Sequence, residues 1–112
     1  MLYLCMSYQI GYYNSSVQTS IDDWPSGVYA SFIKITEQIE RSGPNLGLPY
    51  TRALGDGLFE IRAKGPEGIG RALFCCLINR KVIILHEFIK KTPKIPIKDL
   101  RLARKRLKEI KS

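Results

Sequence analysis

Two apolar runs separated by a short polar turn constrain the fold of this chain more than any other feature. The first run covers residues 72–78, the second covers residues 82–85, and a polar tripeptide lies between them. Strands that are covered on both faces have this continuous apolar character, whereas half-exposed strands alternate. The pattern therefore predicts two central, antiparallel strands, residues 70–79 and 82–89, joined by a tight hairpin.

The segments on either side of this hairpin predict an α+β domain. Residues 6–13 and 58–64 alternate in the manner of strands. Helical periodicity marks a short segment capped by Ser15, then residues 27–41 and finally residues 97–111. The expected order is β-α-α-β-β-β-α in one domain over residues 1–112. We expect an antiparallel sheet with the N-terminal helices and the C-terminal helix packed on one face of it.

Each of the two longer helices carries one apolar stripe. The apolar positions recur at intervals of three and four residues, which places them on one face of a helix. The residues expected to be buried are Val28, Phe32, Ile35 and Ile39 in the first of these helices and Leu100, Ala103, Leu107 and Ile110 in the last.

The cysteines and the N-terminal segment predict a cytoplasmic protein. Cys5, Cys75 and Cys76 are odd in number and two are adjacent, so neither a disulfide framework nor a zinc site is indicated. Cys75 and Cys76 lie in an apolar run and are expected in the core. Residues 1–7 lack the features of a signal peptide, and no stretch reaches the ~18 apolar residues of a membrane span. We therefore expect no membrane contact.

Positive charge is concentrated in the second half of the chain. The sequence has 18 Lys and Arg and 10 Asp and Glu, which gives a formal net charge of +8. Residues 1–56 carry three basic and five acidic side chains, whereas residues 57–112 carry fifteen basic and five acidic side chains. This asymmetry predicts a polyanionic partner, which is nucleic acid or an anionic membrane surface.

The predicted strand at residues 58–64 sorts its side chains onto two faces. Because successive residues of a strand point to opposite sides, one face is charged and the other is apolar. The charged face carries Glu60, Arg62 and Lys64, and the apolar face carries Phe59, Ile61 and Ala63. Arg62, and Arg71 on the next strand, are expected at exposed positions.

Four segments resemble, in order, motifs of the phage-derived branch of RelE/HigB-like toxins. Residues 48–62 (LPYTRALGDGLFEIR) resemble its LP…GLxELR segment, and residues 71–74 (RALF) resemble its arginine-containing strand. Residues 86–96 (HEFIKKTPKIP) resemble its lysine and proline segment, and Ala103 with Arg106 matches a motif of its last helix. The resemblance spans about residues 8–110.

The resemblance implies a RelE-like fold and the toxin half of a toxin–antitoxin system. The implied activity is a ribosome-dependent mRNA endoribonuclease that inhibits translation. The implied partners are the ribosome, mRNA and a cognate antitoxin of the helix–turn–helix type. RNA is cut without a metal when the 2′-OH attacks the adjacent phosphate, which needs a base, an acid and cations. The sequence has no acidic cluster suited to two Mg²⁺ ions, so we expect no metal and no cofactor.

The arginines and Glu60 are the first candidates for the site. By resemblance, Arg71 contacts the scissile phosphate, and guanidinium geometry suits bidentate phosphate binding. Arg62 and Glu60 lie two residues apart on one strand face and are expected to be catalytic. Glu60 acts as a base or orients Arg62; the structural alternative is a surface ion pair of little energetic value.

The remaining candidates lie near the ends of the predicted strands. Lys90 and Lys91 are expected to bind phosphates or neutralise the transition state; alternatively they only close a strand end. His86 is the one histidine and can serve as the acid at neutral pH, although a lone histidine in a strand is more often structural. Arg52 and Lys64 are the expected RNA-binding residues.

Phe74 stands where the resembled family has a tyrosine, which leaves the mechanism open. If a phenolic hydroxyl is needed for base stacking or proton transfer, this chain lacks it at that position. One alternative is therefore a non-catalytic, phage-derived protein that binds nucleic acid through its basic final helix. Another is a structural or assembly protein that uses the basic face for protein contacts.

Overall fold

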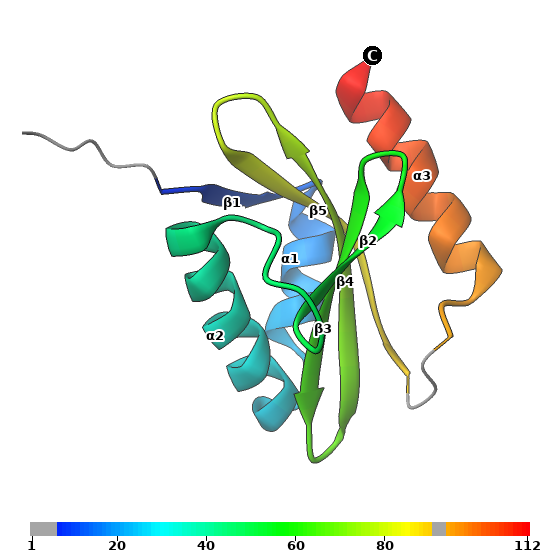
Figure 1. The fold of residues 1–112 in the computed structure, drawn as a ribbon. Coiled ribbons are helices and arrows are strands. Elements are labelled where there is room, and N and C mark those ends of the chain that lie inside the picture. The colour runs from blue at the N-terminus through cyan, green and yellow to red at the C-terminus, as the bar shows by residue number, and fades with distance from the viewer. Residues whose placement is uncertain (1–6, 91–93) are drawn as a thin grey trace, which may run out of the picture.

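The computed structural model describes residues 7–90 and 94–112, which form a five-stranded sheet with helices on both faces (Figure 1). The predicted α+β class, the three helices and the four predicted strands are confirmed, although the first strand has only four residues, and the last helix has the predicted bounds. The elements are β1 (Gln9–Tyr12), α1 (Ser15–Asp22), α2 (Ser26–Ser42), β2 (Thr51–Gly55), β3 (Leu58–Gly65), β4 (Gly68–Leu77), β5 (Lys81–Lys90) and α3 (Ile97–Lys111).

The order of the strands is β1-β5-β4-β3-β2, so the two apolar runs lie inside the sheet as predicted. Strands β2 to β5 pair antiparallel in sequence order. β1 instead pairs parallel with β5, and the prediction of a wholly antiparallel sheet is wrong at this edge. Parallel neighbours need a long connection rather than a hairpin, and every other element except α3 lies between β1 and β5 in the chain.

β2 is a short strand that the hydrophobic pattern does not indicate, because Thr51 is its one buried residue. Its sequence signal is the turn that follows. Asp56 and Gly57 have φ angles of 53° and 84°, the left-handed conformation that two-residue hairpin turns require. An Asp-Gly pair favours this turn, and the turn connects β2 directly to β3.

The helices lie on opposite faces of the sheet, and the prediction that they cover one face is wrong (Figure 1). The physical reason is that β4 and β5 carry apolar side chains toward both faces, and each face needs a cover. One apolar cluster joins α1 and α2 to residues such as Ile61, Ala72, Phe74 and Ile84; the other joins α3 to Leu58, Leu73, Cys75 and Leu85.

The predicted helix stripes are confirmed by burial. The four apolar positions of α2 are all buried; in α3, two are buried and two pack partly buried against the same cluster. Cys75 is buried and Cys76 half-buried, and burial raises the pKa of both thiols. The cap of α1 lies one residue earlier than predicted: Asn14 Oδ1 accepts a hydrogen bond from the Val17 amide at 2.9 Å.

The corner between α1 and α2 is fixed to the middle of the sheet by Trp24. Its ring lies against Gly70, where an added Cβ would come within 2.5 Å of the indole. Its Nε1 donates a hydrogen bond to Glu87 Oε1 of β5 at 2.8 Å. Gly70 therefore permits the close approach that sets the position of α2 against β3 and β4.

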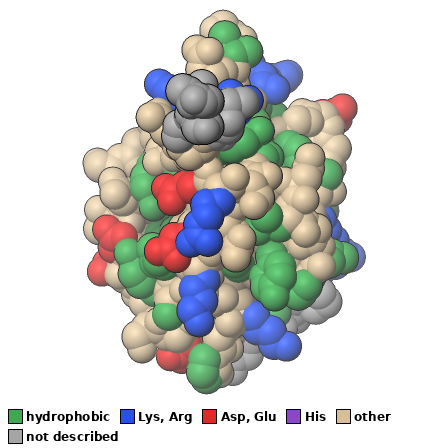
Figure 2. Space-filling view, turned by 60° about the vertical axis from the view of Figure 1, so that its left-hand side comes forward, with side chains coloured by type: hydrophobic (Ala, Val, Ile, Leu, Met, Phe, Trp, Pro, Cys, Tyr) green, Lys and Arg blue, Asp and Glu red, His purple; other side chains and the backbone are tan. Residues whose placement is uncertain are grey.

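The side of the molecule that bears α2 is not a single basic patch. In Figure 2, which brings that side forward, Lys and Arg side chains alternate with Asp and Glu and with apolar groups. Exposed residues of α2 include both Lys34 and Glu37. Within the described residues, no helix is long and apolar enough to cross a membrane.

Candidate nucleic-acid interface

Cations from three strands occupy neighbouring register positions on the face of the sheet that carries α3. Arg62 of β3 pairs with Arg71 of β4. Two residues further along β3, on the same face, Lys64 pairs with Ile69, which in turn pairs with Lys90 of β5. Directly paired residues of antiparallel strands point to the same face, so these four basic side chains share one region of it.

α3 packs on the other half of this face. Ala103 and Leu107 contact the cluster of Leu58, Leu73 and Leu85, which lies toward the opposite end of the strands. Lys64 and Lys90 stay exposed at their end. The face is therefore divided into a half that is covered by a helix and a half that presents cations.

Arg71 does not lie on the surface, and its predicted exposed position is wrong. Its side chain has no exposed area, although it projects from the same face of the sheet as the exposed Lys64 and Lys90. Its Nη1 donates a hydrogen bond to Oε2 of Glu60 at 2.9 Å. Burial lowers the pKa of the Arg71 guanidinium; the Glu60 carboxylate opposes this shift, and the nearby cations Arg62 and Arg52 add to it.

Glu60 joins two arginines on the strands that flank it. Its Oε1 accepts a hydrogen bond from Arg52 Nε at 2.9 Å, and its Oε2 accepts the bond from Arg71. Glu60 is fully buried, so it is not part of a surface ion pair, and its partners are Arg52 and Arg71 rather than Arg62. Arg52 reaches the surface with 39% of its side chain exposed. The carboxylate thereby ties β2 to β4 across β3.

Arg62 lines a hollow of about 340 Å³ at the edge of the sheet. β2 stops pairing with β3 at Ile61, which leaves the following residues of β3 as an edge. The hollow is lined by Ser31, Pro49, Tyr50, Arg62, Lys64 and Ile69. Arg62 is half-buried, and its buried Nε has no hydrogen-bond partner among residues 7–90 and 94–112. The Nε atom itself is buried, but the half-buried side chain lines the hollow and can contact an anionic ligand there.

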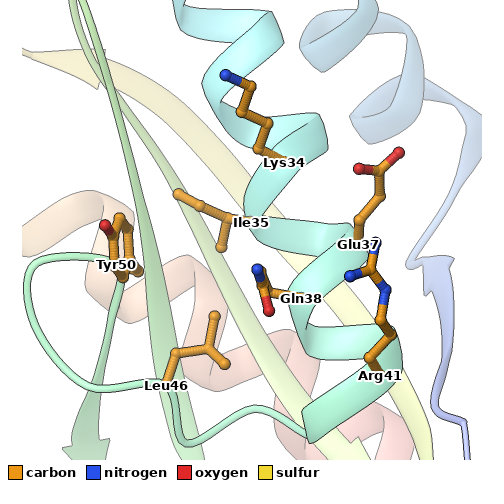
Figure 3. Close-up of a pocket in the computed structure, with 7 residues that line it drawn as sticks. All are labelled: Lys34, Ile35, Glu37, Gln38, Arg41, Leu46 and Tyr50. Carbon is orange, nitrogen blue, oxygen red and sulfur yellow. The ribbon is translucent and has the colours of Figure 1, made fainter.

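A second hollow of about 500 Å³ lies between α2 and the loop before β2 (Figure 3). In Figure 3, Leu46 and Tyr50 of the loop face Ile35 and Gln38 of the helix. Tyr50 lines both hollows, so it stands between them. Tyr50 is a candidate that the sequence analysis did not single out; its sequence signal is an aromatic residue in a Gly- and Pro-rich loop directly before basic strands.

His86 contacts the first turn of α3. Its Nε2 lies 2.7 Å from Oδ1 of Asp99, and its side chain is mostly buried. His86 pairs with Leu73, two register positions from the pairing of Arg71 with Phe88 and on the same face. The histidine therefore lies close to the cation cluster and also links β5 to α3. The predicted catalytic Lys91 lies outside the described residues.

Phe74 points away from the cation cluster. It is fully buried in the cluster beneath α1 and α2, and its ring stacks on Phe59 with centroids 5.4 Å apart. An aromatic side chain at this position contacts the protein core. It does not reach a ligand on the face that carries α3.

Two arginines of α3 bind the protein's own backbone. Arg104 donates hydrogen bonds to the carbonyl oxygens of Leu54 and Gly55, and Arg106 donates one to the carbonyl of Leu85 at 2.6 Å. These arginines fasten α3 to the sheet. Exposed basic residues remain on the outer side of the helix: Lys98, Arg101, Lys105, Lys108 and Lys111.

This chain belongs to the family described as Phage derived protein Gp49-like, whose model matches residues 19–108. Its fold is similar to a chain of the archaeal RelE–RelB complex from Pyrococcus horikoshii OT3, with a TM-score of 0.55 and 17% identity over 75% of this chain and 96% of that one. It is also similar to a chain of the toxin–antitoxin complex RelBE2 from Mycobacterium tuberculosis, with a TM-score of 0.54 and 19% identity over 80% and 98% of the two chains.

These similarities confirm the resemblance to RelE-like proteins that the sequence motifs indicated. At such identities the two solved structures establish the fold. No curated protein matches the chain.

Proposed function

We propose that this chain is the toxin of a toxin–antitoxin pair and an mRNA endoribonuclease that acts on the ribosome. The observation that carries the proposal is the group of Arg62, Lys64 and Lys90, beside the buried Arg71, on the half of a RelE-like sheet that α3 does not cover. The two similar solved chains come from complexes of RelE with RelB and of a toxin with its antitoxin, which supports a cognate antitoxin as the partner.

The proposed reaction uses the RNA itself as the nucleophile. The 2′-hydroxyl loses its proton to solvent water and its oxygen forms a bond to the adjacent phosphorus. The bond from phosphorus to the 5′-oxygen breaks, and that oxygen takes up a proton. The products are a 2′,3′-cyclic phosphate and a 5′-hydroxyl end. Arg62, Lys64 and Lys90, with Lys91 next in the sequence, stabilise the negative charge of the phosphorane.

We assign the arginines and Glu60 to two roles: direct contact with the RNA phosphate, and positioning of the residue that makes this contact. Because Arg62 is partly exposed and Arg71 is buried, Arg62 is the better candidate for the direct phosphate contact. Arg71 and Arg52 are both held by the Glu60 carboxylate. We assign them the role of positioning Arg62 and raising the positive electrostatic potential where the phosphate binds. Glu60 has no exposed surface from which to accept a proton, so we assign it a positioning role rather than that of a base.

His86 is the proposed proton donor to the 5′-oxygen. Its partner Asp99 would hold the imidazole in one orientation, as a carboxylate does for a catalytic histidine. The same contact also fits a purely structural role, in which His86 fastens α3. A variant distinguishes the two roles, as described in the Discussion.

A second candidate function is nucleic-acid binding without cleavage. The burial of Glu60 and Arg71 favours it, because neither side chain is exposed to a ligand. The core position of Phe74 favours it too, because the aromatic residue of this motif cannot contact RNA. Binding would then rely on Arg62, Lys64 and the exposed lysines of α3.

The decisive experiment is induced expression in bacteria with and without the neighbouring open reading frame. We expect growth arrest and blocked translation from the chain alone, rescue by the neighbour, and new mRNA 5′ ends within codons. An Arg62→Ala variant is the control for cleavage. Unimpaired growth with soluble, folded protein contradicts the proposal, and association with RNA without new 5′ ends supports the binding protein instead.

The antitoxin is expected to cover the cations with an acidic segment. Opposite charge gives rapid association, and exposed charges are screened over about 8–10 Å at ordinary ionic strength. Co-purification with the neighbouring gene product should therefore weaken as salt rises. A neighbour that neither binds the chain nor restores growth contradicts the pairing.

A further inference from the structure

Tyr50 is an exposed aromatic residue on a loop that is held in place. Four large hydrophobic residues are highly exposed among the described residues, and Tyr50 is the aromatic one. Its exposed fraction is 52%. Its amide and that of Thr51 both donate hydrogen bonds to the Gly47 carbonyl at 3.0 Å, and Thr51 Oγ1 donates to the Pro44 carbonyl. An ordered loop that presents a bare aromatic face at little entropic cost is typical of a binding site.

The backbone couples Tyr50 directly to the cation cluster. The Tyr50 carbonyl accepts a hydrogen bond from the Arg62 amide at 2.8 Å, which fixes the Tyr50 backbone next to Arg62 of β3. Tyr50, Arg62 and Lys64 then line the same hollow of about 340 Å³. None of the six residues that line this hollow is acidic. The hollow therefore combines an apolar π surface with two cations, the half-buried Arg62 and the exposed Lys64.

This combination matches one unit of a single-stranded nucleic acid. A base offers a flat π surface to an aromatic ring, and the adjoining phosphate offers an anion to a guanidinium and an ammonium. An acidic protein segment would satisfy the cations but has no general use for the exposed ring. The second hollow, on the other side of Tyr50, has Lys34, Arg41 and one carboxylate, Glu37, on its wall, so it is less suited to a phosphate than the first hollow.

We propose that Tyr50 is a stacking platform for a base of single-stranded RNA, with Arg62 and Lys64 holding the phosphate beside that base. This inference rests on the proposed RNA-directed function and adds to it a residue that positions the RNA. The aromatic contact comes from the loop before β2, since Phe74 is part of the core.

The test measures RNA binding by the full chain, without the ribosome. The probe is a short single-stranded oligoadenylate RNA that contains 2-aminopurine, titrated at low salt while its fluorescence is recorded. We expect quenching by the parent chain. Tyr50→Ala should lose the quenching and weaken binding roughly 5- to 100-fold, the range for loss of one base–aromatic stack. Tyr50→Phe keeps the ring and should stay within about twofold of the parent.

Leu48→Ala is the matched control, because Leu48 is 63% exposed on the same loop. It should bind the probe like the parent, and all variants should melt at similar temperatures. The inference is overturned if the parent does not bind the probe, or if Tyr50→Ala binds as tightly as Leu48→Ala. It is also overturned if Tyr50→Ala impairs capture of the neighbouring gene product alone, since the surface then serves a protein partner.

These outcomes are separable from those of the proposed function. If Tyr50→Ala binds the probe normally while induced parent chain still arrests growth, only the stacking platform is wrong. If Tyr50→Ala loses binding while the parent produces no new mRNA ends, the platform stands and the endoribonuclease is wrong.

Discussion

The two faces of the sheet differ in how much of their surface is used for packing. The face beneath α1 and α2 is apolar across β3, β4 and β5, and the one carboxylate there, Glu87, is hydrogen-bonded to Trp24. The face beneath α3 is apolar over one half and carries Arg62, Arg71, Lys64 and Lys90 over the other. Stability is therefore expected from the first face, and ligand binding from the open half of the second.

The two arginines in the same register position show this division at close range. Arg71 is buried and paired with Glu60, whereas Arg62 is half-buried with an unpartnered Nε in the described residues. Arg62 and Arg71 have the same charge and are directly paired, yet we expect different roles for them. The buried ion pair holds Arg71 and Glu60 in place, whereas the part-exposed guanidinium of Arg62 can bind an anionic ligand.

The largest expected effect is on the apolar face. Phe32→Ala removes a fully buried ring whose centroid lies 5.5 Å from that of Trp24. We expect the free energy of unfolding to fall by about 3–5 kcal/mol, measured by urea denaturation. Ile78→Ala is the control, since Ile78 is 85% exposed, and it should change stability by less than about 0.5 kcal/mol. A loss below about 1 kcal/mol for Phe32→Ala would show that this face does not carry the stability.

The next largest effect is expected for the buried carboxylate of Glu60, which binds Arg52 and Arg71. Glu60→Gln leaves the Arg71 charge buried without its carboxylate, which should cost about 3 kcal/mol of folding stability. The double variant Glu60→Leu with Arg71→Met should recover much of that loss, because apolar groups of similar size replace the pair. The free energies of unfolding of the single and double variants, measured by urea denaturation, complete a double-mutant cycle. Unchanged stability of Glu60→Gln would mean that the carboxylate does not compensate Arg71.

Arg62→Ala should separate binding from stability. It removes a half-buried guanidinium with an unpartnered Nε, so the free energy of unfolding should change by less than about 1 kcal/mol. RNA binding should fall roughly 10- to 100-fold, in keeping with a lost charge-assisted hydrogen bond, and growth arrest should disappear. Arg71→Ala should lose both stability and activity.

The matched charge control is Lys105→Ala, which removes an exposed cation of α3. Equal behaviour of Arg62→Ala and Arg71→Ala would remove the distinction between them.

The smallest effect concerns His86. His86→Leu removes the contact with Asp99 and should lower stability by about 0.5–1.5 kcal/mol, as Asp99→Asn should also do. If His86 is the proton donor, mRNA cleavage falls more than about 100-fold in His86→Leu but much less in Asp99→Asn. Equal, small losses of cleavage in both variants would assign His86 to fastening α3. Mapping of mRNA ends after induction measures the difference.

Several parts of this fold could be predicted because they depend on neighbours in the sequence. The spacing of Ala103 and Leu107 defined the buried side of α3, and the apolar runs defined the inner strands β4 and β5. Alternation in β3 placed Arg62 and Ile61 on opposite faces. The family motifs pointed to the arginines of β3 and β4 as the site.

Other features could not be predicted because they depend on which segments meet. β2 is stabilised by pairing with β3 rather than by its own pattern, although the Asp56-Gly57 turn was a usable signal. The burial of Glu60 follows from having β2 on one side and β4 on the other. The exposure of Tyr50 beside Arg62 follows from where β2 stops.

The sequence by itself therefore determined the local elements, the alternation of faces and the excess of positive charge in the second half. Tertiary structure decided which charges are available. Two arginines at paired register positions have the same formal charge, and only the strands, helices and carboxylates around them make one a buried partner of Glu60 and leave the other open to a ligand. The reason is physical: burial, hydrogen bonding and electrostatic potential at a side chain are set by all the groups that surround it, and most of these are distant in the chain.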